Sequence, residues 1–141
     1  MTSVQALEHT ELAGFAQEWF DKLSRHDPVE EMLPFVADAG LDMAFPERTL
    51  RSHADFRDWY AVVGEAFADQ SHDIERLEFR PAADDVEAVD VAVTVVWRAK
   101  NTADGSLTAV RVDQQWRLAM RPGAVLPVIT TYRVGDFTPV A

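Results

Sequence analysis

The sequence contains no cysteine among its 141 residues. Disulfides, thiolate nucleophiles and cysteine-based zinc or iron–sulfur sites are therefore excluded, and a reducing compartment is expected. Glycine is also scarce: the six glycines are isolated and form neither a GxGxxG motif nor a phosphate-binding loop, which argues against nucleotide cofactors. The four histidines show no HxH or HExxH spacing. We therefore predict neither a cofactor nor a metal site.

Basic residues and long apolar runs are few as well. The 13 Lys and Arg are outnumbered by 24 Asp and Glu, and the resulting net charge of −11 repels nucleic-acid phosphates and anionic lipids. No apolar run approaches the roughly 18 residues that a membrane span needs. The start MTSVQALEHTE lacks the basic-then-apolar order of a signal peptide. We expect a cytoplasmic protein that contacts neither nucleic acid nor membrane.

Apolar and aromatic side chains, by contrast, are plentiful. Hydrophobic residues make up 48% of the chain, with eight Phe and four Trp, which is typical of a globular protein. A chain of this length buries about 70% of its unfolded surface when it folds as one unit. We predict a single domain over residues 1–141.

The N-terminal part has the pattern of two helices. Apolar residues recur at helical spacing from Thr10 to an expected helix end near Arg25. Asp27 then has the position of an N-cap before Pro28, and Pro34 limits the length of the second helix.

A third helix is predicted after a capping box formed by Ser52 and Asp55. Its apolar positions continue to Phe67 and place Trp59 and Tyr60 next to each other.

The remaining segments have a period of two, which indicates β-strands. The step from Ile74 to Leu77 requires a bulge, and Ala103-Asp104-Gly105 supplies a hairpin turn. The predicted strands cover 41–45, 72–79, 89–98, 110–120 and 125–134, with a turn at Pro122-Gly123 and an interruption at Pro127. Helices followed by consecutive strands favour an α+β fold over a parallel βαβ fold.

This order of elements resembles the nuclear-transport-factor-2-like (NTF2-like) superfamily, in particular its SnoaL-like and ketosteroid-isomerase-like members. The resemblance covers nearly the whole chain. It rests on the aromatic first helix ending in Arg25-His26-Asp27, the strand LDMAFP, the helix HADFRDWY, the segment SHDIERLEF, the valine strand ending in Trp97, and the hairpin of QQWRLAM with VITTYRV. It implies a cystatin-like cone, in which three helices pack on a curved mixed, mainly antiparallel sheet around an apolar cavity. It also implies frequent homodimers through the outer face of the sheet.

One position departs from the isomerase pattern. In that branch a catalytic aspartate directly precedes the proline that ends the first strand, whereas Phe45 precedes Pro46 here. Asp42 does not occupy an equivalent position. This departure argues against an isomerase that uses the same base.

His72 is the main candidate for catalysis, because it opens a strand just after the third helix, where related members often direct side chains into the cavity. A histidine titrates near neutrality and can act as general acid or base. The alternative is a strand-end histidine bonded to backbone or facing water. Ser71 and Asp73 flank it, but neighbouring strand residues point to opposite faces and cannot form a triad.

Further candidates are defined by position in a predicted element. Tyr60 is a second catalytic candidate that either donates to a carbonyl or oxyanion of a ligand or packs in the core. Gln114 is in register with the apolar face of its strand, so its amide is either bonded structurally or offered to a ligand. Six aromatic residues are expected to form the wall of a site for an apolar ligand, and a filled core would use the same residues. They are Phe15, Trp19, Phe45, Trp59, Trp97 and Trp116.

Our functional hypothesis is a small-molecule binder or cofactor-independent enzyme of the SnoaL-like kind, acting on an apolar or polycyclic carbonyl compound by acid/base chemistry. The resemblance also allows a non-catalytic ligand carrier or a scaffold subunit. An ionisable partner within hydrogen-bond reach of His72, opening into a cavity, favours catalysis. A filled core favours the scaffold.

Overall fold

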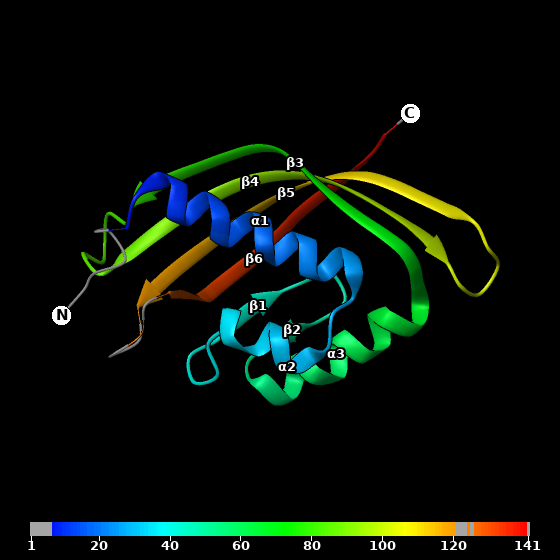
Figure 1. Ribbon diagram of the computed structural model, residues 1–141, viewed down its shortest axis with the longest axis horizontal. Helices are drawn as coiled ribbons and strands as arrows, with labels where there is room; N and C mark the ends of the chain where they lie inside the picture. Colours follow the sequence, from blue (N-terminus) through cyan, green and yellow to red (C-terminus); the bar gives the residue numbers. More distant parts are fainter. Residues whose placement is uncertain (1–6, 121–123, 125, 141) are drawn as a thin grey trace.

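The computed structural model describes residues 7–120, 124 and 126–140. A long helix lies across a curved sheet, and the shorter helices close one end of it (Figure 1). The elements in chain order are α1 (His9–Arg25), α2 (Val29–Met32), a 3-10 turn η2 (Leu33–Phe35), β1 (Asp42–Ala44), β2 (Thr49–Leu50), α3 (His53–Ala66), β3 (Phe67–Pro81), β4 (Ala88–Asn101), β5 (Leu107–Met120) and β6 (Pro127–Pro139).

The sheet has six strands in the order β2-β1-β6-β5-β4-β3. Only β1 and β6 pair in parallel, so the sheet is mixed and mainly antiparallel, as predicted. Its curvature has a local cause. The pairing register shifts twice in β3, once between Ile74 and Arg76 where a bulge was predicted, and twice more between β5 and β6. Each shift bends a strand and increases its twist.

The first helix forms largely as predicted. Glu8 and Glu11 make a capping box at its start, and His26 ends it in the left-handed conformation with φ 51°. Its buried face packs on β3 and on aromatic side chains of β5 and β6, and Trp19 and Phe20 have no exposed surface. The core of the protein therefore lies between this helix and the inner face of the sheet.

The predicted N-cap at Asp27 is wrong, because Pro28 is the residue that caps α2. The carboxylate of Asp27 is instead bound by Arg25, at 2.9 Å, and by Lys22, at 3.7 Å. An aspartate held by two cations has no free oxygen directed at the helix start. The second helix is four residues long and continues as the 3-10 turn that contains Pro34.

A capping contact and several boundaries also differ from the predictions. The Ser52 hydroxyl accepts from the Asp55 amide as expected, but the Asp55 carboxylate accepts from Arg51 instead of Ser52. Phe67 begins β3 rather than ending α3. The last strand begins at Pro127 and runs to Pro139, because a proline at a strand start loses no ladder hydrogen bond. The predicted turn at 122–123 lies outside the described residues.

The hairpin turn after β4 is confirmed, with Gly105 at φ 74° where a side chain would be strained. Within the part of the chain that the structure describes, no helix is both long and apolar enough to cross a membrane.

Candidate functional site

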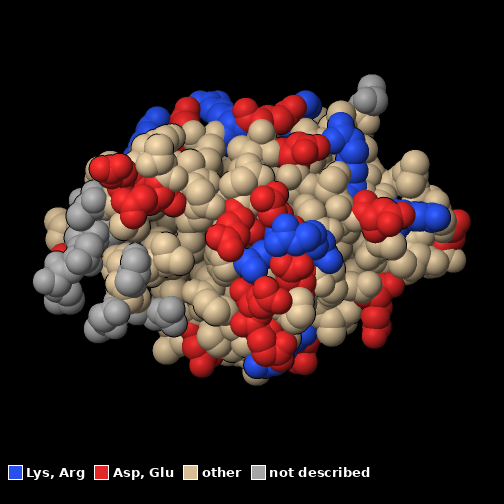
Figure 2. Space-filling view, viewed as in Figure 1, with Lys and Arg blue, Asp and Glu red and all other residues tan. Residues whose placement is uncertain are grey.

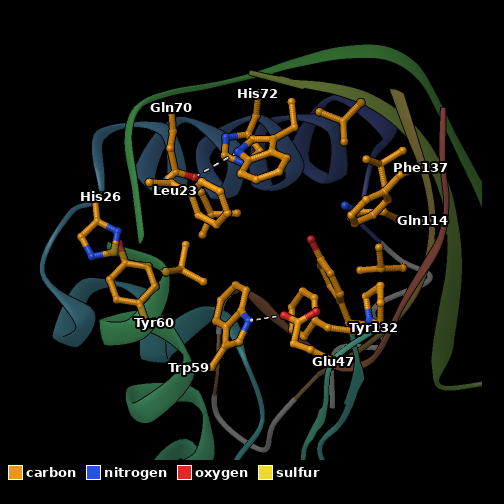
Figure 3. A pocket seen from close by; sticks show the side chains of 18 residues that line it. Leu23, His26, Glu47, Trp59, Tyr60, Gln70, His72, Gln114, Tyr132 and Phe137 are labelled. Carbon is orange, nitrogen blue, oxygen red and sulfur yellow. Dashed lines mark hydrogen bonds between the residues drawn. The ribbon is translucent and has the colours of Figure 1, made fainter. Parts of the chain in front are cut away.

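A cavity of about 320 Å³ lies between the C-terminal end of α1, α3 and the inner face of the sheet (Figure 3). This volume is in the range of small-molecule sites. The residues that line it are Leu23, His26, Phe45, Pro46, Glu47, Trp59, Tyr60, Val63, Phe67, Gln70, His72, Val95, Trp97, Val112, Gln114, Tyr132, Val134 and Phe137. Most of them are apolar, so polar groups in the cavity are few and individually important.

The hydrogen bond between Ser24 and His72 links the tautomer of the imidazole to the orientation of one hydroxyl. The Ser24 hydroxyl oxygen lies 2.9 Å from the Phe20 carbonyl oxygen and 2.9 Å from His72 Nδ1. When the hydroxyl donates to Phe20, it accepts from an Nδ1–H of His72, and Nε2 carries the lone pair. When it donates to Nδ1, Nε2 carries the ring proton. No group within the described residues hydrogen-bonds to Nε2, so this nitrogen is available to a ligand.

Burial also determines the charge of His72. The ring stacks on Phe20 with centroids 5.6 Å apart, and desolvation lowers its pKa from 6.5 to about 4. The imidazole is therefore neutral near neutral pH and acts as an acceptor. Its neighbour Asp73 pairs with Arg98 on the exposed side of the sheet, in agreement with the expected absence of a local triad.

Tyr60 lines the cavity, but its hydroxyl is already engaged. It donates to the backbone carbonyl of Asp27 at 2.5 Å. The ring stacks on His26 at a centroid distance of 4.1 Å and an angle of 9°. Burial raises the pKa of Tyr60, so its hydroxyl stays protonated. Tyr60 therefore contributes an aromatic ring to the cavity wall, while its hydroxyl proton is used in the hydrogen bond to the segment between α1 and α2.

Tyr132, which sequence analysis did not single out, has the opposite arrangement. Its oxygen receives the Trp19 indole N–H at 3.5 Å and interacts with the Gln114 side chain. Its own proton has no acceptor among the described residues, and Figure 3 shows the hydroxyl pointing toward the middle of the cavity. Burial raises its pKa well above the usual value. Tyr132 is a neutral hydrogen-bond donor directed at the cavity.

Gln114 makes the structural hydrogen bond that one of its two alternatives predicted. Its Oε1 accepts from the Trp116 indole N–H at 3.0 Å, which is a structural bond. Its amide is nevertheless part of the cavity wall and borders Tyr132. The same side chain therefore positions the Tyr132 hydroxyl and borders the space for a ligand.

Comparisons with known proteins identify the architecture. No family model matches the sequence, and no curated protein matches it. An NTF2-like superfamily protein from Salmonella enterica superposes with a TM-score of 0.79 at 12% identity, covering 94% of this chain and 91% of that one. A hexachlorocyclohexane dehydrochlorinase, LinA-type3 from Novosphingobium barchaimii, has a TM-score of 0.76 at 12% identity, with 94% and 89% covered. The yeast UBP3-associated protein BRE5 has a TM-score of 0.71 at 10% identity, with 99% and 100% covered. The chain has the NTF2-like fold.

The predicted aromatic residues are divided by this NTF2-like fold into two groups. Phe45, Trp59 and Trp97 line the cavity, where Phe45 stacks on Trp59 at 4.3 Å. The Trp97 indole N–H donates to Gln70 at 3.1 Å. The other three predicted residues lie in the core behind the cavity and are not among its lining residues, namely Phe15, Trp19 and Trp116. Trp19 and Trp116 still act on the site, because their indole N–H groups bond to Tyr132 and Gln114.

Three further polar residues of the NTF2-like cavity were not predicted. His26 fits closely against Gly64, and its Nδ1 is buried without a partner among the described residues. Glu47 lies in the loop between β1 and β2, and Gln70 lies at a register shift in β3. Neither position belongs to a periodic pattern, so periodicity did not indicate these residues. Tyr132, by contrast, is on the same strand face as Val134, and that alternation was a usable signal.

The candidate site shows no arrangement typical of metal binding. The described residues include no group of three or more His, Asp or Glu side chains that could hold a metal ion.

Proposed function

We propose that this protein binds an apolar or polycyclic carbonyl compound and moves a proton on the carbon next to the carbonyl group. The supporting observation is that an unengaged ring nitrogen, His72 Nε2, and a hydroxyl with an unengaged proton, that of Tyr132, belong to residues that line the same cavity. Such a pair matches the two needs of carbonyl-assisted proton transfer, which are a base and a donor for the developing oxyanion.

In the proposed reaction the ligand carbonyl accepts a hydrogen bond from Tyr132. His72 Nε2 removes a proton from the adjacent carbon, and the electron pair moves into the carbonyl to form an enolate. Tyr132 stabilises the negative charge on the oxygen, aided by the dipole of the Gln114 amide. The imidazolium then returns the proton to another carbon, which is an isomerisation, or to a leaving group, which is an elimination.

The surrounding residues support this chemistry by excluding water and by preorganisation. In the proposed reaction Ser24 donates to the Phe20 carbonyl and accepts from His72 Nδ1–H, which leaves on Nε2 the lone pair that a base requires. Trp59, Trp97 and Tyr60 supply a flat apolar surface for a ring system. In such surroundings hydrogen bonds to a developing charge are stronger than in water.

Deuterium exchange tests the proposal without knowledge of the natural substrate. Polycyclic ketones such as 1-tetralone and 1-indanone are incubated with the protein in D₂O, and loss of the proton next to the carbonyl is followed by NMR. His72→Asn keeps a donor for Ser24 but lacks Nε2, so we expect exchange to fall by about 100-fold or more. Tyr132→Phe should lower it by about 10- to 100-fold. His9→Gln, a change outside the cavity lining, should leave it unchanged. Equal exchange by wild type and His72→Asn would contradict the proposed role of His72.

A non-catalytic ligand carrier is the second candidate, and one observation favours it. Within the described residues the hydrogen-bond partner of His72 is the hydroxyl of Ser24, not an ionisable group. A carrier would bind the ketones, as measured by calorimetry, without accelerating their exchange. Binding without accelerated exchange in the wild type, in His72→Asn and in Tyr132→Phe would support the carrier.

We also propose a homodimer formed through the outer face of the sheet. This face carries cross-strand ion pairs, including Arg111 with Glu75 and Arg117 with Asp90. Light scattering coupled to size-exclusion chromatography measures the mass directly, and a monomer at micromolar concentration would contradict the prediction.

A further inference from the structure

The lining of the cavity has an unbalanced charge. Glu47 is its one carboxylate, and no Lys or Arg is among the lining residues that the structure describes. The two histidines do not offset this charge, because burial lowers the pKa of both His26 and His72. Near neutral pH the cavity wall is therefore negative.

Glu47 lies where a charged part of a ligand would meet both a carboxylate and aromatic rings. Its side chain is exposed, and Oε1 accepts from the Trp59 indole N–H at 3.4 Å. Phe45, two residues earlier, stacks on the same indole at 4.3 Å. Figure 3 shows the carboxylate beside Trp59 at the edge of the cavity. A cation placed next to Glu47 thus lies beside the aromatic wall of the cavity.

The carboxylates near another part of the wall are paired with cations. The charges of Asp27 and Glu31 contribute to the raised pKa of Tyr60, which borders the cavity, but Lys22 and Arg25 form ion pairs with them. Figure 2 shows acidic side chains gathered around a few basic ones on the face that carries α1 and α2. The carboxylate of Glu47 is therefore the charge of the described lining that an anionic ligand would meet.

We propose that the ligand is a cation: a ring compound carrying a protonated amine or quaternary ammonium group, with the ammonium beside Glu47 and the rings in the cavity. The attraction comes from the charge of the carboxylate. This inference rests on the proposed function and narrows its substrate class to amine-bearing carbonyl compounds. Ligands with a carboxylate or phosphate bind less tightly because the same charge repels them.

Three matched naphthalene compounds test the preference by isothermal titration calorimetry at pH 7. They are 2-(aminomethyl)naphthalene, 2-naphthalenemethanol and 2-naphthoate, which differ mainly in charge. We expect the ammonium compound to bind about 2- to 5-fold more tightly than the alcohol, and the naphthoate to bind most weakly.

Two variants assign the effect to Glu47. Glu47→Gln should abolish most of the advantage of the ammonium compound over the alcohol. Glu18→Gln removes the same charge from an exposed position of α1 outside the lining and should preserve the advantage. An ammonium compound that binds no better than the alcohol in wild type, or keeps its advantage in Glu47→Gln, overturns the inference. Binding of the alcohol and deuterium exchange of the ketones test the proposed function without a charged ligand. Failure of the cation preference can therefore be distinguished from failure of the proposed function.

Discussion

Replacing His72 by asparagine should make the protein less sensitive to acid. The imidazole has a pKa of about 4 in the folded protein against 6.5 as an unperturbed group. Between these values the unfolded chain binds a proton that the folded chain does not. Stability due to this difference is fully present above pH 6.5 and is lost as the pH falls toward 4. Asparagine does not titrate, so the variant lacks this loss.

The size of the effect follows from the two pKa values. The full lowering of the His72 pKa corresponds to about 3 kcal/mol of unfolding free energy, because each pKa unit is worth about 1.4 kcal/mol. Between pH 7 and pH 5 the wild type should lose about 2 kcal/mol of unfolding free energy more than the variant. His26 also has a lowered pKa, but it is present in both proteins and its contribution cancels.

Urea unfolding followed by tryptophan fluorescence at pH 7, 6 and 5 measures this difference. At pH 7 we expect His72→Asn to be the less stable protein, because it loses the stacking of the ring on Phe20. Its deficit should shrink as the pH falls. His9→Gln provides a histidine control, and its stability should follow that of the wild type. Parallel curves for wild type and His72→Asn would refute the argument that His72 is buried in the neutral form.

Two further changes test the junction beside the cavity. Gly64→Ala places a methyl group 2.2 Å from His26 Nε2, so overpacking should lower stability by about 1–3 kcal/mol in thermal or urea unfolding. Gly14→Ala is the matched control, since its added methyl meets no atom within 4 Å and should instead stabilise the helix by about 0.5–1 kcal/mol. A stabilised Gly64→Ala would disprove the close fit. Tyr60→Phe leaves the Asp27 carbonyl without its donor and should cost about 1–2 kcal/mol; an unchanged urea midpoint would show that this hydrogen bond contributes nothing.

The helices and strands could be predicted because their signals are local. The valine alternation of β4 and the aromatic face of α1 both point inward in the structure, as their periods of two and 3.6 require. The errors occur where a tertiary partner changes a local preference. Asp27 is the clearest case, because a capping residue by sequence is bound instead by Arg25 and Lys22.

The candidate site could be predicted only in part. His72, Trp59 and Gln114 were found from their positions in predicted elements, and all three line the cavity. Tyr132 was not singled out, although it lies on an inward strand face. Its role depends on Trp19, which is 113 residues away in the chain and donates its indole N–H to the Tyr132 oxygen. This hydrogen bond does not use the proton of the Tyr132 hydroxyl. Glu47 follows a proline after a three-residue strand, where no periodic pattern applies.

The sequence by itself determined that cysteine chemistry is absent, and it determined the α+β order of the elements and the inward faces of α1 and β4. These properties depend on residue type and on spacings of two to four positions. Only the tertiary structure decided which inward residues fill the core and which border a cavity. Trp19 and Trp59 have the same chemistry and similar helical patterns, yet one has no exposed surface and the other faces the cavity. The hydrophobic effect is non-directional, so a pattern shows that a side chain turns inward but not whether another residue occupies the space it faces.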